Sequence, residues 1–190
     1  MIDLLYAISQ KDHQLLVLAI DHFLHQASPT KNELIEIIAS FPLLVENYPE
    51  PVALIAPSKK DKKITWFIYE ELIWGIGEAF RHILQAKKNL CKEPDLYKAI
   101  EKTTVDKTYG KGRQSFIMLL PLFNRFDSTQ LLRSLLKDKD IDGHVIYTAR
   151  KLRIIELQEE IRPFLDCQIT WIRNEAKKYF SSIQKPTAKA

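Results

Sequence analysis

The chain is poor in the residues that mark turn-rich, disulfide-bonded or membrane-spanning proteins. It has 190 residues but only 5 glycines and 2 cysteines. Scarce glycine disfavours a β fold with many tight turns, and the spacing of Cys91 and Cys167 fits neither a metal site nor a disulfide framework. No apolar run reaches the roughly 18 residues of a membrane-spanning helix. Because Asp3 replaces the basic start of a secretory signal, we expect a cytoplasmic protein that makes no membrane contact.

Patterns for catalysis and metal binding are missing as well. The five histidines form no HxxxH or HExxH pattern, and no GxSxG occurs. The GKG at 110–112 lacks the Gly-Lys-Ser/Thr ending of a phosphate loop. Glu70, Glu71 and Glu78 share one expected helix and could supply half of a carboxylate metal site, but no Glu-x-x-His partner appears, which favours a solvated face. We expect no catalytic residue, metal or cofactor.

What the chain has in abundance is apolar residues, 46% of the total, at helical spacing. About nine helices are predicted, at 2–26 (with a break near QKDH), 29–41, 64–86, 94–102, 114–125, 128–137, 142–153, 156–165 and 168–182. Ser28 is the expected cap of the second helix, with Pro29 at its first position. The fold class is therefore all-α.

The connections predict one domain over 1–183. Four prolines in 42–63 predict a long connection with at most short helical turns. The stretch 103–113 is expected to be a polar loop. Connections of two to four residues between the later helices imply antiparallel packing of consecutive helices, and 184–190 should form a mobile tail.

Two stretches near the end of the chain look like copies of one unit: LLKDKDIDGHVIYTARKL (135–152) and FLDCQITWIRNEAKKYF (164–180). Each holds a stripe of apolar, alanine and apolar residues at i, i+4 and i+7. The second stripe repeats the first at a constant sequence offset, which relates Val145 to Ile172, Ala149 to Ala176 and Leu152 to Tyr179. A central alanine allows a neighbouring helix to approach closely. A two-helix period of roughly 27–30 residues is typical of α-solenoids, in which successive pairs stack.

These stretches resemble the HEAT-repeat family in its short bacterial form, as do WGIGEAF and GKGRQSFIMLLPLFNRFDSTQLLRSLLKD. The resemblance covers about 64–183. The Val-Arg that HEAT repeats often carry is matched by Ile172-Arg173 but not by Val145-Ile146, and the proline-rich segment also departs from the pattern. The resemblance implies a right-handed, armadillo-like α–α superhelix. A plain helix bundle is the alternative.

In a HEAT-type stack the second helices line the concave side, and the residues beside the buried stripe point there. The predicted partner-binding residues carry aromatic, amide and charged groups: Glu71, Trp74, Met118, His144, Tyr147, Lys151, Trp171, Asn174 and Lys178. Exposed tryptophan and tyrosine are frequent anchors of protein interfaces. The alternative for the tryptophans is ordinary core packing.

The expected function is non-enzymatic protein binding by a monomer. The first 95 residues carry a net charge of −3 and the remainder +7, so the second half favours an acidic partner. By family resemblance, the most specific hypothesis is an immunity protein that neutralises a bacterial toxin domain. The alternatives are nucleic-acid binding, as in HEAT-like alkylpurine DNA glycosylases, and an accessory subunit of a tetrapyrrole lyase. Nucleic acid is disfavoured because acidic residues interrupt the basic face.

Overall fold

The computed structural model describes residues 4–26, 28–52 and 66–184. In these ranges every regular element is helical apart from an isolated bridge between Pro51 and Phe67, which confirms the all-α prediction. Residues 53–63 of the proline-rich connection, the first two residues of the helix predicted at 64–86 and residues 185–190 of the expected tail lie outside the described residues. The contacts divide the chain into two compact units, Met1–Phe116 and Ile117–Ala190. One continuous domain over 1–183 stays a prediction.

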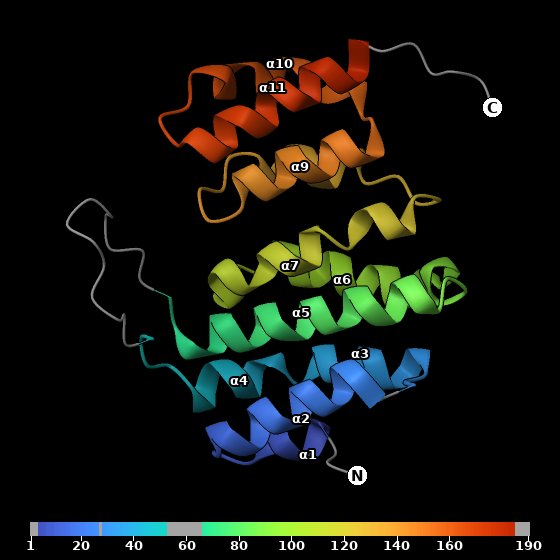
Figure 1. Ribbon diagram of the computed structural model, residues 1–190, viewed down its shortest axis with the longest axis vertical. Helices are drawn as coiled ribbons and strands as arrows, with labels where there is room; N and C mark the ends of the chain where they lie inside the picture. Colours follow the sequence, from blue (N-terminus) through green and yellow to red (C-terminus); the bar gives the residue numbers. More distant parts are fainter. Residues whose placement is uncertain (1–3, 27, 53–65, 185–190) are drawn as a thin grey trace. The chain divides into compact units, whose positions relative to one another are not determined.

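Unit 1 is built around the long helix α5, which packs against α2, α4 and the turn η2 (Figure 1). Its α-helices are α1 (Leu4–Ser9), α2 (His13–Gln26), α3 (Lys31–Ala39), α4 (Phe41–Asn47), α5 (Ile68–Ala86) and α6 (Pro94–Val105). Short 3-10 helices are η1 (Leu90–Lys92) and η2 (Lys107–Gly112), and α7 (Arg113–Ile117) follows. Within 4–26, 28–52 and 66–184, no helix is both long and apolar enough to cross a bilayer.

Aromatic side chains form the centre of unit 1. Phe41 packs edge-on against Tyr109 and Phe116, with ring centroids 5.7 and 5.4 Å apart, and Phe80 lies 5.7 Å from Phe116. All four rings are buried. Each such pair adds about 0.5–1.5 kcal/mol beyond the burial of its area. This cluster ties α4, α5, η2 and α7 together.

Local hydrogen bonds set the first helix boundaries. The predicted break in 2–26 is present, because the Asp12 carboxylate accepts two backbone N–H groups of the following turn, each at 3.0 Å. The expected cap at Ser28 is wrong: α3 starts after Thr30. The Thr30 hydroxyl accepts the backbone N–H of Glu33, whose carboxylate accepts the N–H of Thr30 at 2.7 Å. This reciprocal capping box satisfies two otherwise free donors.

The predicted polar loop at 103–113 is in fact packed against α5. The Glu70 side chain is 3% exposed; one oxygen accepts the Lys111 N–H at 2.8 Å, and the other caps the start of α5. Gly110 has φ +47°, and a Cβ there would meet the Glu70 carboxylate. Arg113, 1% exposed, donates to the Gly110 carbonyl at 2.7 Å. Glu70 is therefore a buried structural acid and not part of a solvated face.

Unit 2 contains two successive helical pairs. Its elements are η3 (Leu120–Phe123), α8 (Thr129–Leu135), α9 (Asp142–Leu152), η4 (Ile155–Leu157), α10 (Gln158–Ile161), η5 (Arg162–Asp166) and α11 (Thr170–Gln184). The helices expected at 114–125 and 156–165 are broken into shorter pieces. Pro121 and Pro163 are each the second residue of a 3-10 segment, and proline cannot donate the hydrogen bond that would continue the preceding α-helix.

The predicted buried stripe is confirmed in unit 2. Ala149 and Ala176 have 0% exposure, and so does Tyr179, whose hydroxyl donates to the Ile154 carbonyl at 2.6 Å. Leu152, expected in the same stripe, is only half-buried. The small alanines leave room for α9 and α11 to pack closely, side by side (Figure 1).

The contacts between α9 and α11 share an almost constant sequence offset. The rings of His144 and Trp171 lie 5.0 Å apart, and their offset in the sequence equals that of the two alanines. The ion pair of Arg150 with Glu175 has nearly the same offset. Antiparallel neighbours would give a constant sum of residue numbers instead. The two helices therefore run parallel, as equivalent elements of a repeat do.

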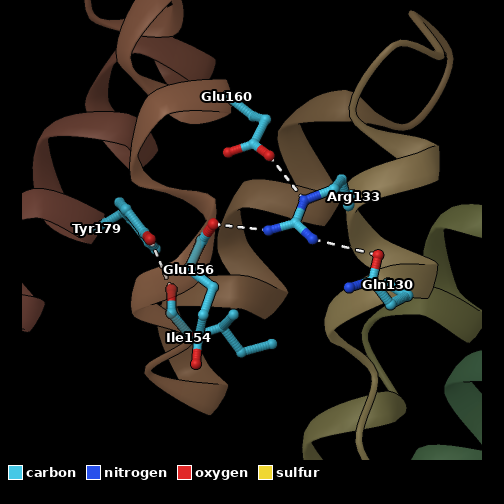
Figure 2. A network of polar contacts seen from close by, with 6 residues as sticks. All are labelled: Gln130, Arg133, Ile154, Glu156, Glu160 and Tyr179. Atoms are coloured by element: carbon cyan, nitrogen blue, oxygen red, sulfur yellow. Dashed lines mark hydrogen bonds and ion pairs between the residues drawn. The ribbon is translucent and has the colours of Figure 1, made fainter.

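The first helices of the two pairs repeat this offset. On α8, Arg133 donates to the carboxylate of Glu160 on α10 at 2.7 Å, and these two residues are as far apart in the sequence as the two alanines. Arg133 also donates to the backbone carbonyl of Glu156 at 2.8 Å (Figure 2). Both members of the first pair thus meet their counterparts in the second pair at the same offset along the chain.

Candidate functional site

Six of the nine predicted partner-binding residues lie on α9 and α11, where these helices adjoin. On each helix they occupy positions i, i+3 and i+7 beside the buried stripe. We call them the α9–α11 surface: His144, Tyr147, Lys151, Trp171, Asn174 and Lys178. Lys151, Trp171, Asn174 and Lys178 are exposed, and the other two are half-buried.

The Trp171 side chain rests on the first turn of α9 and remains 46% exposed. Its ring covers Gly143, where a Cβ would come within 2.0 Å of the indole, and its centroid lies 5.0 Å from that of His144. Burial lowers the pKa of His144 to about 4, so this imidazole is neutral at pH 7. Among the described residues its buried Nδ1 has no hydrogen-bond partner. The result is an uncharged aromatic pair with part of the indole facing solvent.

Cations surround the second aromatic residue of the surface. The Arg150 guanidinium and the Lys151 ammonium lie 5.1 and 5.6 Å from the centre of the Tyr147 ring. Arg150 also pairs with Glu175 at 3.0 Å, and Lys178 reaches the same carboxylate at 2.6 Å. Burial raises the pKa of Glu175, but hydrogen bonds from Lys178 and Arg150 outweigh it and the net shift is downward. Three cations against one ionised acid leave this part of the surface positive.

The other three predicted residues lie elsewhere. Glu71 is exposed and Trp74 half-buried on α5 of unit 1, and Met118 is half-buried in the turn between α7 and η3. They take no part in the contacts that join α9 to α11. Their share in a binding surface stays a prediction.

The sequence reasoning overlooked residues on the first helices of the pairs in unit 2. A groove there is lined by charged side chains of α8 and the following turn, including Arg133 and Lys137, and by Phe164 of η5. Its signal was present in the sequence: Arg133 precedes Glu160, and Lys137 precedes Phe164, by the same offset as Ala149 precedes Ala176. At that spacing, aromatic and charged positions had been aligned on the second helices alone, and Arg133 and Lys137 lie on the first helix and the turn after it.

In the part of the chain that the structure describes, no three His, Cys, Asp or Glu side chains gather as metal ligands. Cys91 is buried, and burial raises the pKa of its thiol, which disfavours the reactive thiolate.

Comparisons with known proteins return no match to this chain, whether the search is made against protein-family models, curated proteins or solved structures. The resemblance to HEAT repeats therefore depends on the quoted stretches alone.

Proposed function

We propose that this chain is a non-enzymatic protein-binding module of the HEAT type that contacts its partner through the α9–α11 surface. The observation that carries the proposal is Trp171, a large aromatic side chain that is 46% exposed yet fixed by its contacts with Gly143 and His144. A side chain already held in place loses little conformational entropy on binding, so more of its contact energy appears as affinity.

The composition of the surface suits a protein partner. Tryptophan, tyrosine and arginine are the residues most often found at energetic hot spots of interfaces, and Trp171, Tyr147 and Arg150 lie on two adjoining helices. Tyr147 is held within reach of two cations, and Arg150 is fixed by Glu175. These preformed contacts favour a rigid docking face.

The charges of the surface select the kind of partner. Arg150, Lys151 and Lys178 outnumber Glu175, so the partner should present acidic groups around an apolar centre. Nucleic acid, the second hypothesis, gains less support. Arg173, next in sequence to the stripe residue Ile172, donates to the Cys167 carbonyl at 2.6 Å and so is engaged within the turn before α11.

The decisive experiment is a double substitution at the surface. Tyr147→Ala combined with Lys151→Ala should weaken binding of a partner recovered from native lysate about tenfold or more, because hot-spot truncations cost about 2 kcal/mol or more. Lys98→Ala, an exposed lysine of α6, is the control. Isothermal titration calorimetry measures affinity, and thermal unfolding monitors stability.

The melting temperature should stay nearly unchanged in both variants. A large drop in the double variant would mean that Tyr147 and Lys151 are structural. Unchanged affinity together with unchanged stability would contradict the α9–α11 surface as the binding face.

The most specific form of the proposal is an immunity protein that binds and blocks a toxin domain in the cytoplasm of the producing bacterium. It comes from the family resemblance and is tested separately. If a toxin-like domain is encoded directly upstream, its expression should arrest growth, and co-expression of this chain should restore it. Restoration that survives the double substitution would separate neutralisation from the α9–α11 surface.

A further inference from the structure

We propose that a second site, the α8–η5 groove, binds an acidic peptide segment of a partner protein that also offers an apolar side chain. The groove lies wholly within unit 2 and has a volume of about 670 Å³. Its main lining residues are Arg133, Leu136, Lys137, Lys139, Glu160 and Phe164. It is formed by the first helices of the two pairs, whereas the α9–α11 surface is formed by the second helices.

The floor of the groove is apolar and shallow. Leu136 is 4% exposed and Phe164 is half-buried, while Lys137 and Lys139 around them are exposed. A small-molecule site normally encloses most of its ligand. Here Leu136 is the one buried residue of these four, so the groove would leave most of a ligand exposed. This suits an extended peptide segment that lies across the groove and inserts one apolar side chain.

Two lysines set the charge of the rim. The described residues offer Lys137 no ion pair, and Lys139 sits 5.3 Å from the Phe164 ring centre while pairing with Asp142 at 3.3 Å. The Lys139 side chain is 82% exposed, so its ammonium retains donors for a ligand. Asp138, which falls between the lysines in sequence, accepts the N–H of Asp140 and does not line the groove. The lining therefore favours carboxylates over cations.

The ion pair of Arg133 with Glu160 favours a peptide over a nucleic acid. The Arg133 guanidinium already donates to the Glu160 carboxylate, the Glu156 carbonyl and the Gln130 side-chain oxygen at 2.7, 2.8 and 3.2 Å (Figure 2). It is not available as the bidentate fork that recognises phosphate or carboxylate, so the acidic groups of a ligand must bind the two lysines. A hydrogen bond from its own backbone N–H and another from Arg133 lower the pKa of Glu160. Its carboxylate would repel the evenly spaced charges of a phosphodiester chain, whereas a peptide can place its acidic side chains beside Lys137 and Lys139 and away from Glu160.

Fluorescence anisotropy with a defined probe tests the site on the full chain. The probe is a fluorescein-labelled peptide of alternating glutamate with leucine or phenylalanine, and its partner probe has glutamine at every glutamate. Lys137→Glu should weaken binding of the acidic probe about tenfold or more, since hydrogen bonds to charged groups contribute about 1.5–3 kcal/mol. Lys177→Glu on α11 makes the same charge change at an exposed site outside the groove and should have a much smaller effect.

Amide NMR shifts separate this site from the α9–α11 surface. The acidic probe should shift signals of α8, the following turn and η5. Shifts confined to α9 and α11, equal binding of the two probes, or equal losses in the Lys137→Glu and Lys177→Glu variants would each overturn the proposal. So would absence of saturable binding, or Lys137-dependent binding of a single-stranded oligonucleotide that is tighter than that of the peptide.

Discussion

Replacing Gly143 by alanine should dislodge Trp171 from α9. Gly143 is buried in the first turn of α9, and a Cβ there would lie 2.0 Å from the nearest indole carbon and 2.5 and 2.7 Å from the next two. Real side chains do not approach so closely. Because the new Cβ is fixed to the backbone of α9, the indole ring is the group that must move.

The cost follows from the area that the ring loses. Tryptophan buries about 150–250 Å² when fully covered, and Trp171 is 46% exposed, so about half of that contact is at risk. At about 25 cal/mol per Å², this corresponds to about 2–3 kcal/mol. Alanine is favoured over glycine in a helix by about 0.5–1 kcal/mol. The net loss in the free energy of unfolding should be about 1–2 kcal/mol.

Gly75→Ala is the matched control. Gly75 lies in the middle of α5, and a Cβ there would meet no atom within 4 Å. This variant should gain about 0.5–1 kcal/mol, because only the helix-propensity term changes. Urea unfolding followed by circular dichroism measures both values. Tryptophan emission should shift to longer wavelength only in Gly143→Ala, as the indole enters water.

If Gly143→Ala is as stable as Gly75→Ala, the position of the indole ring does not depend on the missing Cβ, and the expected loss of stability is wrong. An unshifted emission maximum with normal stability would have the same meaning. A destabilised variant that still binds the partner with full affinity would instead remove Trp171 from the binding surface.

Three further predictions concern unit 2. Tyr179→Phe should lower the free energy of unfolding by about 1–3 kcal/mol, because the buried Ile154 carbonyl loses its hydrogen-bond donor. Burial raises the pKa of Tyr179 from 10.0 to about 12. In denaturant titrations the wild-type protein, unlike the variant, should therefore lose stability as the pH rises from 10 to 12. Burial lowers the pKa of His144 from 6.5 to about 4. The contribution of the neutral imidazole to the free energy of unfolding is therefore complete above pH 6.5 and is lost as the pH falls towards 4. The His144→Phe variant should lose less stability than the wild-type protein over that interval. Arg153→Gly should raise the melting temperature, with a gain of about 0.5–1 kcal/mol, because Arg153 ends α9 with φ 54° in a conformation that suits glycine.

The sequence predicted the parts of the fold that depend on local periodicity. Ala149 and Ala176 are fully buried because the i, i+4, i+7 spacing places them on one helix face, and that spacing is visible without a structure. The Thr30 cap was missed because Ser28 and Thr30 are equally good candidates by residue type. Only the reach of the Glu33 carboxylate, seen in the structure, distinguishes them.

The errors elsewhere come from long-range contacts and from proline. The segment around Gly110 looked like a solvent-exposed loop because the acid that binds it, Glu70, lies far earlier in the chain. Pro121 lies in the interior of the helix predicted at 114–125, where proline removes a backbone hydrogen bond, so the signal for a break there was present in the sequence and was not used. The α8–η5 groove was missed because the repeat spacing was applied to polar residues of the second helices but not to Arg133 and Lys137 of the first pair.

The two candidate surfaces of unit 2 depend on the same stacking of helical pairs, and this decides which substitutions can test function. A larger residue at Ala149 would force α9 and α11 apart, and α11 carries Trp171 while directly following η5, which carries Phe164. Such a change would disturb both surfaces and stability at once. Substitutions at Tyr147 and Lys137, which lie beside the stripe or on the rim, leave the stacking intact. If the Tyr147 and Lys137 substitutions each abolish binding of a different ligand, the two surfaces act independently. If either substitution alone abolishes all binding, one ligand spans both surfaces.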